Sequence, residues 1–315
     1  MLPEDEMNIA FLFPGQGSQF VGMAADLAEV YPPVAATLAQ TDEILGLGLA
    51  ALMREGSAEA LTATEMAQPA LLAHSVAISR VLGEAGVAPM IVAGHSLGEY
   101  SALVAAGALD FAAALRLVRE RGLAMAAAGA EARGAMSAIL GLDDAAVEQV
   151  VAEAGQVGTV VVANYNSPGQ VVISGEVAAV RRAEELAKAA GARGARPLRV
   201  SGAFHSPLMA PAAERLQGAL EAAPLREATV PVVSNVDAQP RTEAEEIREA
   251  LRRQITGNVR WTDSIRRMVA EGVDCFVEVG PGEVLTKLMK RIAPEAEAIS
   301  TSTAEGVGKA LERLL

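Results

Sequence analysis

The stretch from Met90 to Leu109 constrains the fold of this chain more than any other. It opens with a short apolar run that is too short for a helix and is typical of a buried strand in a parallel sheet. Gly94 and Gly98 then bracket Ser96 in a Gly-His-Ser-Leu-Gly turn, and Glu99 opens a predicted helix. This order is typical of a nucleophile elbow, in which the serine Oγ stands clear of the sheet and the next N–H can stabilise an oxyanion. Ser96 is therefore the candidate nucleophile, against the alternative of an ordinary strand-to-helix loop.

The composition excludes several classes of protein. The chain has 315 residues, of which 51% are hydrophobic and 21% charged, so it can bury a substantial core. A net charge of −13 and an aromatic content of 3% argue against binding to nucleic acid. Cys275 is the single cysteine, which excludes an internal disulfide and a cysteine metal cluster, and we predict no metal site. Met1–Glu6 is unlike a signal peptide and no apolar run spans a membrane, so we expect a cytoplasmic protein without membrane contact.

Strands and helices alternate along most of the chain, which predicts an α/β fold. The apolar strands expected at 8–13, 90–93, 230–233 and 276–279 are separated by helical patterns, which favours a mostly parallel sheet flanked by helices. Residues 134–200 instead follow the order strand, helix, strand, strand, helix, strand, which is the ferredoxin-like arrangement. We therefore expect a large domain made of residues 1–133 and 201–315, with residues 134–200 inserted as a small subdomain.

A glycine-rich turn, Pro14–Gln19, follows the first predicted strand. Such turns often cradle phosphate, but neither a dinucleotide fingerprint nor a Walker lysine is present. The alternative is that a backbone N–H near Gln16 serves an active site at the carboxyl ends of the strands.

A serine nucleophile needs a base, and the chain has three histidines. His95 directly precedes Ser96, so its side chain should leave the elbow in another direction. His74 lies on the apolar stripe of a helix predicted from Gln68 to Glu84, with Pro69 in its first turn, and we interpret it as a hydrogen-bonded packing residue. By elimination, His205 is the candidate base. His205 lies farther from the C-terminus than the histidine of an ordinary esterase does. A Ser–His dyad whose imidazole is oriented by a neutral group, such as a backbone carbonyl, is physically as sound as a triad with an acid.

Arg121 falls on the apolar stripe of a helix that Asp110 is expected to cap, whereas Arg119 points nearly opposite. A guanidinium on a core face is costly unless an anion pairs with it. That anion could be an internal Asp or Glu, or a substrate carboxylate held by two hydrogen bonds. The periodicity leaves both alternatives open.

A wider set of motifs runs through the chain in a fixed order: Phe13–Gln19, Gln68–Leu71, Gly94–Ala102, Arg121-Gly122, Asn164–Gln170, Gly202–His205 and Glu278–Gly282. The same order is seen in malonyl-CoA:acyl carrier protein transacylases, and the chain resembles this family from about Asn8 to beyond Arg291. The resemblance implies a hydrolase-like large domain, the small ferredoxin-like one, and an active site in the cleft between them.

The resemblance also assigns roles to the reacting groups. Ser96 would be acylated by malonyl, His205 would act as general base and acid, and Arg121 would bind the malonyl carboxylate. Backbone N–H groups of Gln16 and Leu97 would form the oxyanion hole.

Further positions follow from the same resemblance. The backbone carbonyl of Gln254 would orient His205, and possible cleft-lining residues are Gln68, Asn164 and Phe204. A phenylalanine directly before the histidine resembles malonyl-selective acyltransferases more than methylmalonyl-selective ones.

The implied reaction transfers malonyl from malonyl-CoA to the phosphopantetheine thiol of holo acyl carrier protein, through a malonyl-serine, for fatty acid synthesis and without a bound cofactor. An acidic carrier protein would need local positive charge, although a solvated face is the simpler interpretation of any one basic residue. The candidates are Lys188, Arg193, Arg196 and Arg199, or Lys287, Lys290 and Arg291. The alternatives are a trans-acting polyketide synthase acyltransferase, an editing acyl hydrolase, and a non-catalytic carrier-protein-binding subunit.

Overall fold

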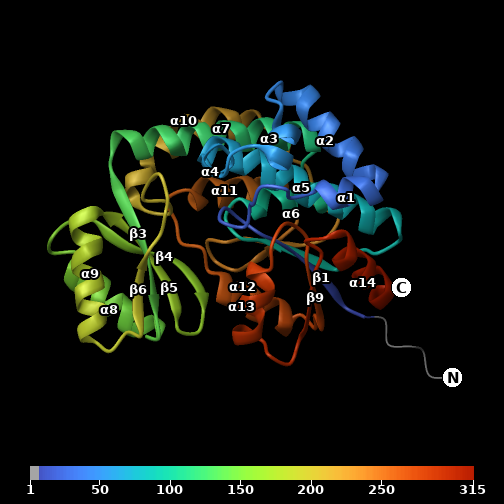
Figure 1. Cartoon of the computed structure of the whole chain (residues 1–315). Coiled ribbons are helices and arrows are strands. Elements are labelled where there is room, and N and C mark those ends of the chain that lie inside the picture. Colours follow the sequence, from blue (N-terminus) through green and yellow to red (C-terminus); the bar gives the residue numbers. More distant parts are fainter. Residues whose placement is uncertain (1–6) are drawn as a thin grey trace.

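The computed structural model describes residues 7–315 and is built around a six-stranded sheet (Figure 1). Its strands, in spatial order, are β10 (Glu297–Ser300), β9 (Cys275–Glu278), β1 (Ile9–Phe13), β2 (Ile91–Gly94), β7 (Val232–Val233) and β8 (Pro240–Arg241). Neighbouring strands from β10 to β7 run parallel, and β8 pairs with β7 in the antiparallel sense. The mostly parallel sheet is confirmed, and β8 and β10 are additions to the predicted strands. The expectation for Met1–Glu6 lies outside the described residues.

Helices cover both faces of this sheet. Successive side chains of β1 point to opposite faces, so Ile9 and Phe11 join one buried cluster with α5 and α6, while Ala10 and Leu12 join another with α12 and α13. The helices of this part of the chain are α1 (Ala25–Val30), α2 (Pro32–Leu45), α3 (Leu49–Glu55), α4 (Ala58–Thr62), α5 (Thr64–Glu84), α6 (Gly98–Ala105), α7 (Phe111–Glu131), α10 (Ala210–Ala222), α11 (Ala244–Gln254), α12 (Trp261–Ala270), α13 (Val284–Ile292) and α14 (Ala304–Leu314). Within residues 7–315, none of the helices combines the length and the hydropathy that a membrane crossing requires.

Helix α5 begins at Thr64 rather than at Gln68, so Pro69 lies inside the helix and not in its first turn. A proline has no N–H, and the carbonyl four residues earlier therefore loses its helical donor. That carbonyl belongs to Glu65, and Arg119 Nη1 of α7 donates a hydrogen bond to it. The tertiary bond compensates for the missing helical one and ties α5 to α7.

A second, four-stranded sheet occupies the left of Figure 1, with two helices packed on one face. Its elements are β3 (Gly134–Leu140), α8 (Asp144–Ala154), β4 (Val160–Ser167), β5 (Gln170–Glu176), α9 (Val177–Ala189) and β6 (Gly194–Pro197). The spatial order β4-β5-β3-β6 with antiparallel pairing is the predicted ferredoxin-like arrangement. Ile139 and Val171 pack against α8 and α9, whereas Met136 and Val172 face the other way and line a cavity. We propose that residues 1–133 and 201–315 form the large domain and residues 134–200 the inserted subdomain.

The two sheets meet where β4 contacts the segment between α11 and α12. Asn164 and Val259 form a parallel bridge, in which Tyr165 N donates to Val259 O at 2.9 Å and Val259 N donates to Ala163 O at 2.8 Å. Asn258 Nδ2 also donates to Val162 O at 2.6 Å, so residues 258–259 are hydrogen-bonded to β4 at the edge of the small sheet although they belong to the large part of the chain.

Candidate active site

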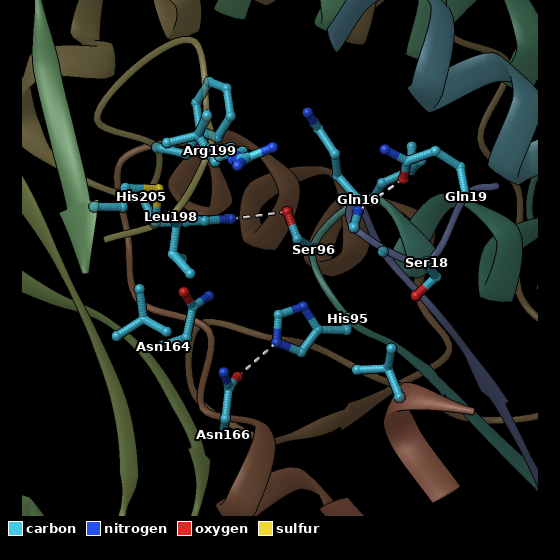
Figure 2. Close-up of a pocket in the computed structure, with 18 of the residues that line it drawn as sticks. Gln16, Ser18, Gln19, His95, Ser96, Asn164, Asn166, Leu198, Arg199 and His205 are labelled. Atoms are coloured by element: carbon cyan, nitrogen blue, oxygen red, sulfur yellow. Dashed lines mark hydrogen bonds between the residues drawn. The ribbon is translucent and has the colours of Figure 1, made fainter. Parts of the chain in front are cut away.

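The turn after β2 holds Ser96 at φ +51°, a left-handed conformation that side chains rarely adopt. The neighbouring glycines make this turn possible. A Cβ on Gly94 would lie 1.9 Å from Gly98 C, and a Cβ on Gly98 would lie 2.0 Å from Phe13 O. Only glycine permits such a close approach of β1, β2 and α6. Ser96 is consequently presented to a cavity at the carboxyl ends of β1 and β2 (Figure 2).

Ser96 Oγ lies 2.7 Å from His205 Nε2, although 109 positions separate the two residues in the chain (Figure 2). The other ring nitrogen, Nδ1, lies 3.0 Å from Gln254 O and 3.1 Å from Gly257 O. Because a carbonyl can only accept, Nδ1 carries the proton and Nε2 turns its lone pair toward Ser96. Burial, followed by the positive charge of Arg121, lowers the pKa of His205 to about 3. The imidazole is therefore neutral, which is the form that a general base needs.

Arg121 lies beside this pair and is 1% exposed. Its Nη2 donates to Ser96 Oγ at 3.2 Å and to Gln254 Oε1 at 3.0 Å, and its Nη1 donates to Gln68 Oε1 at 2.8 Å. All three partners are neutral. In the part of the chain that the structure describes, no Asp or Glu forms an ion pair with Arg121, and its Nε has no hydrogen-bond partner. Within the described residues, no acid therefore pairs directly with Arg121; the buried Glu99 acts on it only through its charge and through Gln254. A buried cation with spare donors thus lies next to Ser96.

Two buried amide side chains hold the backbone of Ser96. Asn235 Oδ1 accepts from Ser96 N at 2.7 Å, and Asn235 Nδ2 donates to Gly94 O at 2.6 Å. Gln254 Nε2 donates to Ser96 O at 2.9 Å, so its side chain acts on the elbow while its carbonyl acts on His205. Sequence reasoning missed Asn235. The available signal was its place just after a strand whose carboxyl end lies at the same sheet edge as the elbow.

Ser96 and His205 open onto a cavity of about 340 Å³. Most of the predicted site residues line it: Gln16, Ser96, Leu97, Arg121, Asn164, Phe204 and His205. Gln68 and Gln254 lie one layer behind this wall, where both accept hydrogen bonds from Arg121. The structure therefore corrects the expected position of Gln68, which supports Arg121 from behind instead of lining the cleft.

The predicted oxyanion-hole residues lie in the turns that follow two neighbouring strands of the large sheet, β1 and β2. Gln16 follows β1, and its side-chain Nε2 donates to Thr64 Oγ1 at 3.2 Å. Leu97 directly precedes α6, where the N–H groups of the first turn favour negative charge. Both residues line the cavity that holds Ser96 Oγ.

The other two histidines are held away from the Ser96 hydroxyl. His95 Nε2 lies 2.8 Å from Asn166 Oδ1, and its ring packs on Trp261 with 5.5 Å between the ring centroids. His74 is buried in α5 without a hydrogen bond from either ring nitrogen to any residue in the described range, so the expected hydrogen bond is missing. Burial lowers the pKa of His74 to about 4, which leaves the ring neutral.

The basic residues considered for carrier-protein docking differ in how near they lie to the cavity. Arg199 lines the cavity mouth next to Leu198 (Figure 2). The others are exposed elsewhere: Lys188, Arg193 and Arg196 on the small sheet and its helix, and Lys287, Lys290 and Arg291 on α13. Lys287 also pairs with Glu283 at 3.4 Å. Arg199 is therefore the candidate that could contact a substrate entering the cavity.

The fold and the Ser–His pair, with carbonyl oxygens behind the histidine, are those of an acyl transferase, and the family model described as acyl transferase domain matches residues 10–310. The chain belongs to the malonyl CoA-acyl carrier protein transacylase family. It is 49% identical over 308 residues to the Bacillus subtilis transacylase, covering 98% of this chain and 97% of that one. With the Escherichia coli K12 transacylase it shares 50% identity over 306 residues, which cover 97% and 99% of the two chains.

A solved structure gives the same result for the fold. A malonyl-transacylase in complex with its type II polyketide synthase acyl carrier protein superposes with a TM-score of 0.95 at 48% identity, over 97% of this chain and 99% of that chain. The α/β fold with its two sheets is therefore shared along nearly the whole length.

Proposed function

We propose that this chain transfers the malonyl group of malonyl-CoA to the phosphopantetheine thiol of holo acyl carrier protein, supplying the extender unit for fatty acid synthesis. The observation that carries the proposal is Arg121, a buried cation with neutral partners, whose Nη2 lies 3.2 Å from the nucleophile Ser96 Oγ. An acyl group that bears its own carboxylate makes use of such a cation, and an uncharged one does not. The names of the relatives agree with this substrate.

In the first half-reaction, His205 Nε2 takes the proton of Ser96 Oγ while that oxygen attacks the thioester carbon. The backbone N–H groups of Gln16 and Leu97 hold the oxyanion. The carbon–sulfur bond then breaks, His205 gives its proton to the sulfur, and coenzyme A leaves as a thiol. Malonyl remains as an ester on Ser96, with its carboxylate on Arg121.

In the second half-reaction, the thiol of the carrier protein's phosphopantetheine arm gives its proton to His205 and attacks the acyl-serine. The ester bond breaks and the proton passes to Ser96 Oγ, which restores the resting enzyme. The carbonyls of Gln254 and Gly257 hold the same tautomer of His205 throughout. Coenzyme A and the arm enter as substrates, no bound cofactor takes part, and we place the reaction in the cytoplasm, which suits a chain with one cysteine.

Intact-protein mass after brief exposure to malonyl-CoA tests this proposal, with Ser96→Ala as the control. We expect one malonyl adduct on the wild type alone, discharged by holo acyl carrier protein. Discharge by water alone would identify an acyl hydrolase, and carrier-protein binding without any adduct would identify a non-catalytic subunit. Faster discharge by a polyketide synthase carrier than by a fatty acid carrier would favour a trans-acting polyketide acyltransferase.

A further inference from the structure

Glu99 is a buried acid that the proposed mechanism does not use. It lies in the first turn of α6 and is 2% exposed. One of its oxygens, Oε2, accepts from Gln254 Nε2 at 2.8 Å and from Asn235 N at 3.2 Å. A carboxyl group is rarely retained in a core unless its hydrogen bonds serve a purpose, so the two partners of Oε2 indicate what Glu99 does.

These partners are the two residues that hold the Ser96 backbone. Asn235 Oδ1 accepts from Ser96 N at 2.7 Å, and Gln254 Nε2 donates to Ser96 O at 2.9 Å. A single oxygen of Glu99 therefore binds both Asn235 and Gln254, and these two residues hold Ser96 at φ +51°. A conformation of this kind persists only where the surroundings determine it from several sides.

The same oxygen also fixes the amide of Gln254 with respect to Arg121. The two hydrogens of Gln254 Nε2 point to Ser96 O and to Glu99 Oε2, and Gln254 Oε1 accepts from Arg121 Nη2 at 3.0 Å. These three hydrogen bonds fix the orientation of the Gln254 amide. Its Oε1 therefore accepts from the Arg121 guanidinium in a single position. Loss of the Glu99 oxygen would free one of these three attachments and leave a buried N–H unpaired.

We infer that Glu99 is a positioning residue that aligns the Arg121 guanidinium through Gln254 and the Ser96 backbone through Gln254 and Asn235. The inference rests on the proposed function, which supplies the carboxylate that Arg121 receives. Both partners of Oε2 are neutral N–H groups, so the role requires an oxygen acceptor at this place and not a negative charge.

The test compares Glu99→Ala with Glu99→Gln. For each variant we would measure the second-order rate of Ser96 acylation by malonyl-CoA and by acetyl-CoA, corrected for the fraction of chains that take up the acyl group. Glu99→Ala should lower the malonyl-to-acetyl ratio by about tenfold, because misalignment of Ser96 slows both acylations, whereas loss of the Arg121 contact to the carboxylate slows only acylation by malonyl-CoA. Glu99→Gln keeps a carbonyl oxygen for both N–H groups and should stay within about threefold of the wild-type ratio.

Glu278→Gln is the matched control. Glu278 is another buried acid, at the end of β9, and it accepts from Leu285 N at 3.0 Å and Thr286 N at 2.7 Å, so the ratio should not change. An unchanged ratio in Glu99→Ala, or an equal fall in Glu99→Ala and Glu99→Gln, would overturn the inference. A wild type without malonyl preference would overturn the proposed function, whereas a malonyl-selective wild type with an insensitive Glu99→Ala would overturn the inference alone.

Discussion

Replacing Arg121 by alanine tests the substrate assignment most directly. A hydrogen bond to a charged group contributes about 1.5–3 kcal/mol. Two such bonds from Arg121 to a malonyl carboxylate amount to about 3–6 kcal/mol, so Arg121→Ala should lower kcat/KM for malonyl-CoA by roughly 10²–10⁴-fold. The acyl group of acetyl-CoA has no carboxylate, so it makes no such bonds to Arg121. Removal of the Arg121 charge also removes one of the causes that lower the pKa of His205. Acylation by acetyl-CoA should therefore be retained.

The assay is acylation of Ser96 by each thioester, followed by intact-protein mass at short times. Arg119→Ala is the matched control on the same helix, because Arg119 bonds to Glu65 O in α5 and has no role in the site. It should reduce stability without changing the malonyl-to-acetyl ratio. A ratio that is equal in Arg121→Ala and wild type would refute the assignment of Arg121 to the substrate carboxylate.

Three further predictions follow from burial and close packing. Burial raises the pKa of Glu99 to about 7, so the pH test of His205 uses Glu99→Gln, which removes that group. In this variant the rate of Ser96 acylation should stay on its plateau from pH 7 down to about 5, because the lowered pKa keeps His205 neutral, and a limb near 6.5 in its pH–rate profile would contradict this. The folded-state pKa of His74, about 4, lies below its ordinary 6.5, so stability that is complete above pH 6.5 should be lost as the pH falls toward 4, by roughly 3 kcal/mol in total. Urea unfolding at several pH values should show a shallower dependence for His74→Leu, and equal slopes would argue against a neutral buried His74. Gly98→Ala should abolish folding, as followed by circular dichroism, because its Cβ would lie 2.0 Å from Phe13 O, whereas Gly218→Ala in α10 meets nothing within 4 Å and should be tolerated.

The elbow was readable from the sequence because its determinants are local. Gly94 and Gly98 are needed by the turn itself, and the 3.6-residue period that places Arg121 on a buried face belongs to a single helix. The fold class was equally accessible, since the alternation of strands and helices and the different order within 134–200 are both patterns along the chain.

The features of the site and the fold that the sequence did not predict depend on contacts between distant segments. Asn235 reaches Ser96 across 139 positions, and only the placing of β7 beside β2 brings the two together. Pro69 was expected to open a helix, but a side chain from α7 replaces the hydrogen bond that the proline removes. Strand β10 is short and only partly buried, so it carries a weak hydrophobic pattern, and its pairing with β9 decides its conformation.

The bridge between Asn164 and Val259 has a consequence for recombining members of this family. Gly257 O lies 3.1 Å from His205 Nδ1, and two residues later the backbone of Val259 is hydrogen-bonded to β4 of the small sheet. A chimera cut only at residues 134 and 200 would place a foreign β4 against the resident segment 257–259 and would shift Gly257 O relative to His205. The exchangeable module is therefore discontinuous, made of residues 134–200 together with 257–259, and donors should be matched at both places.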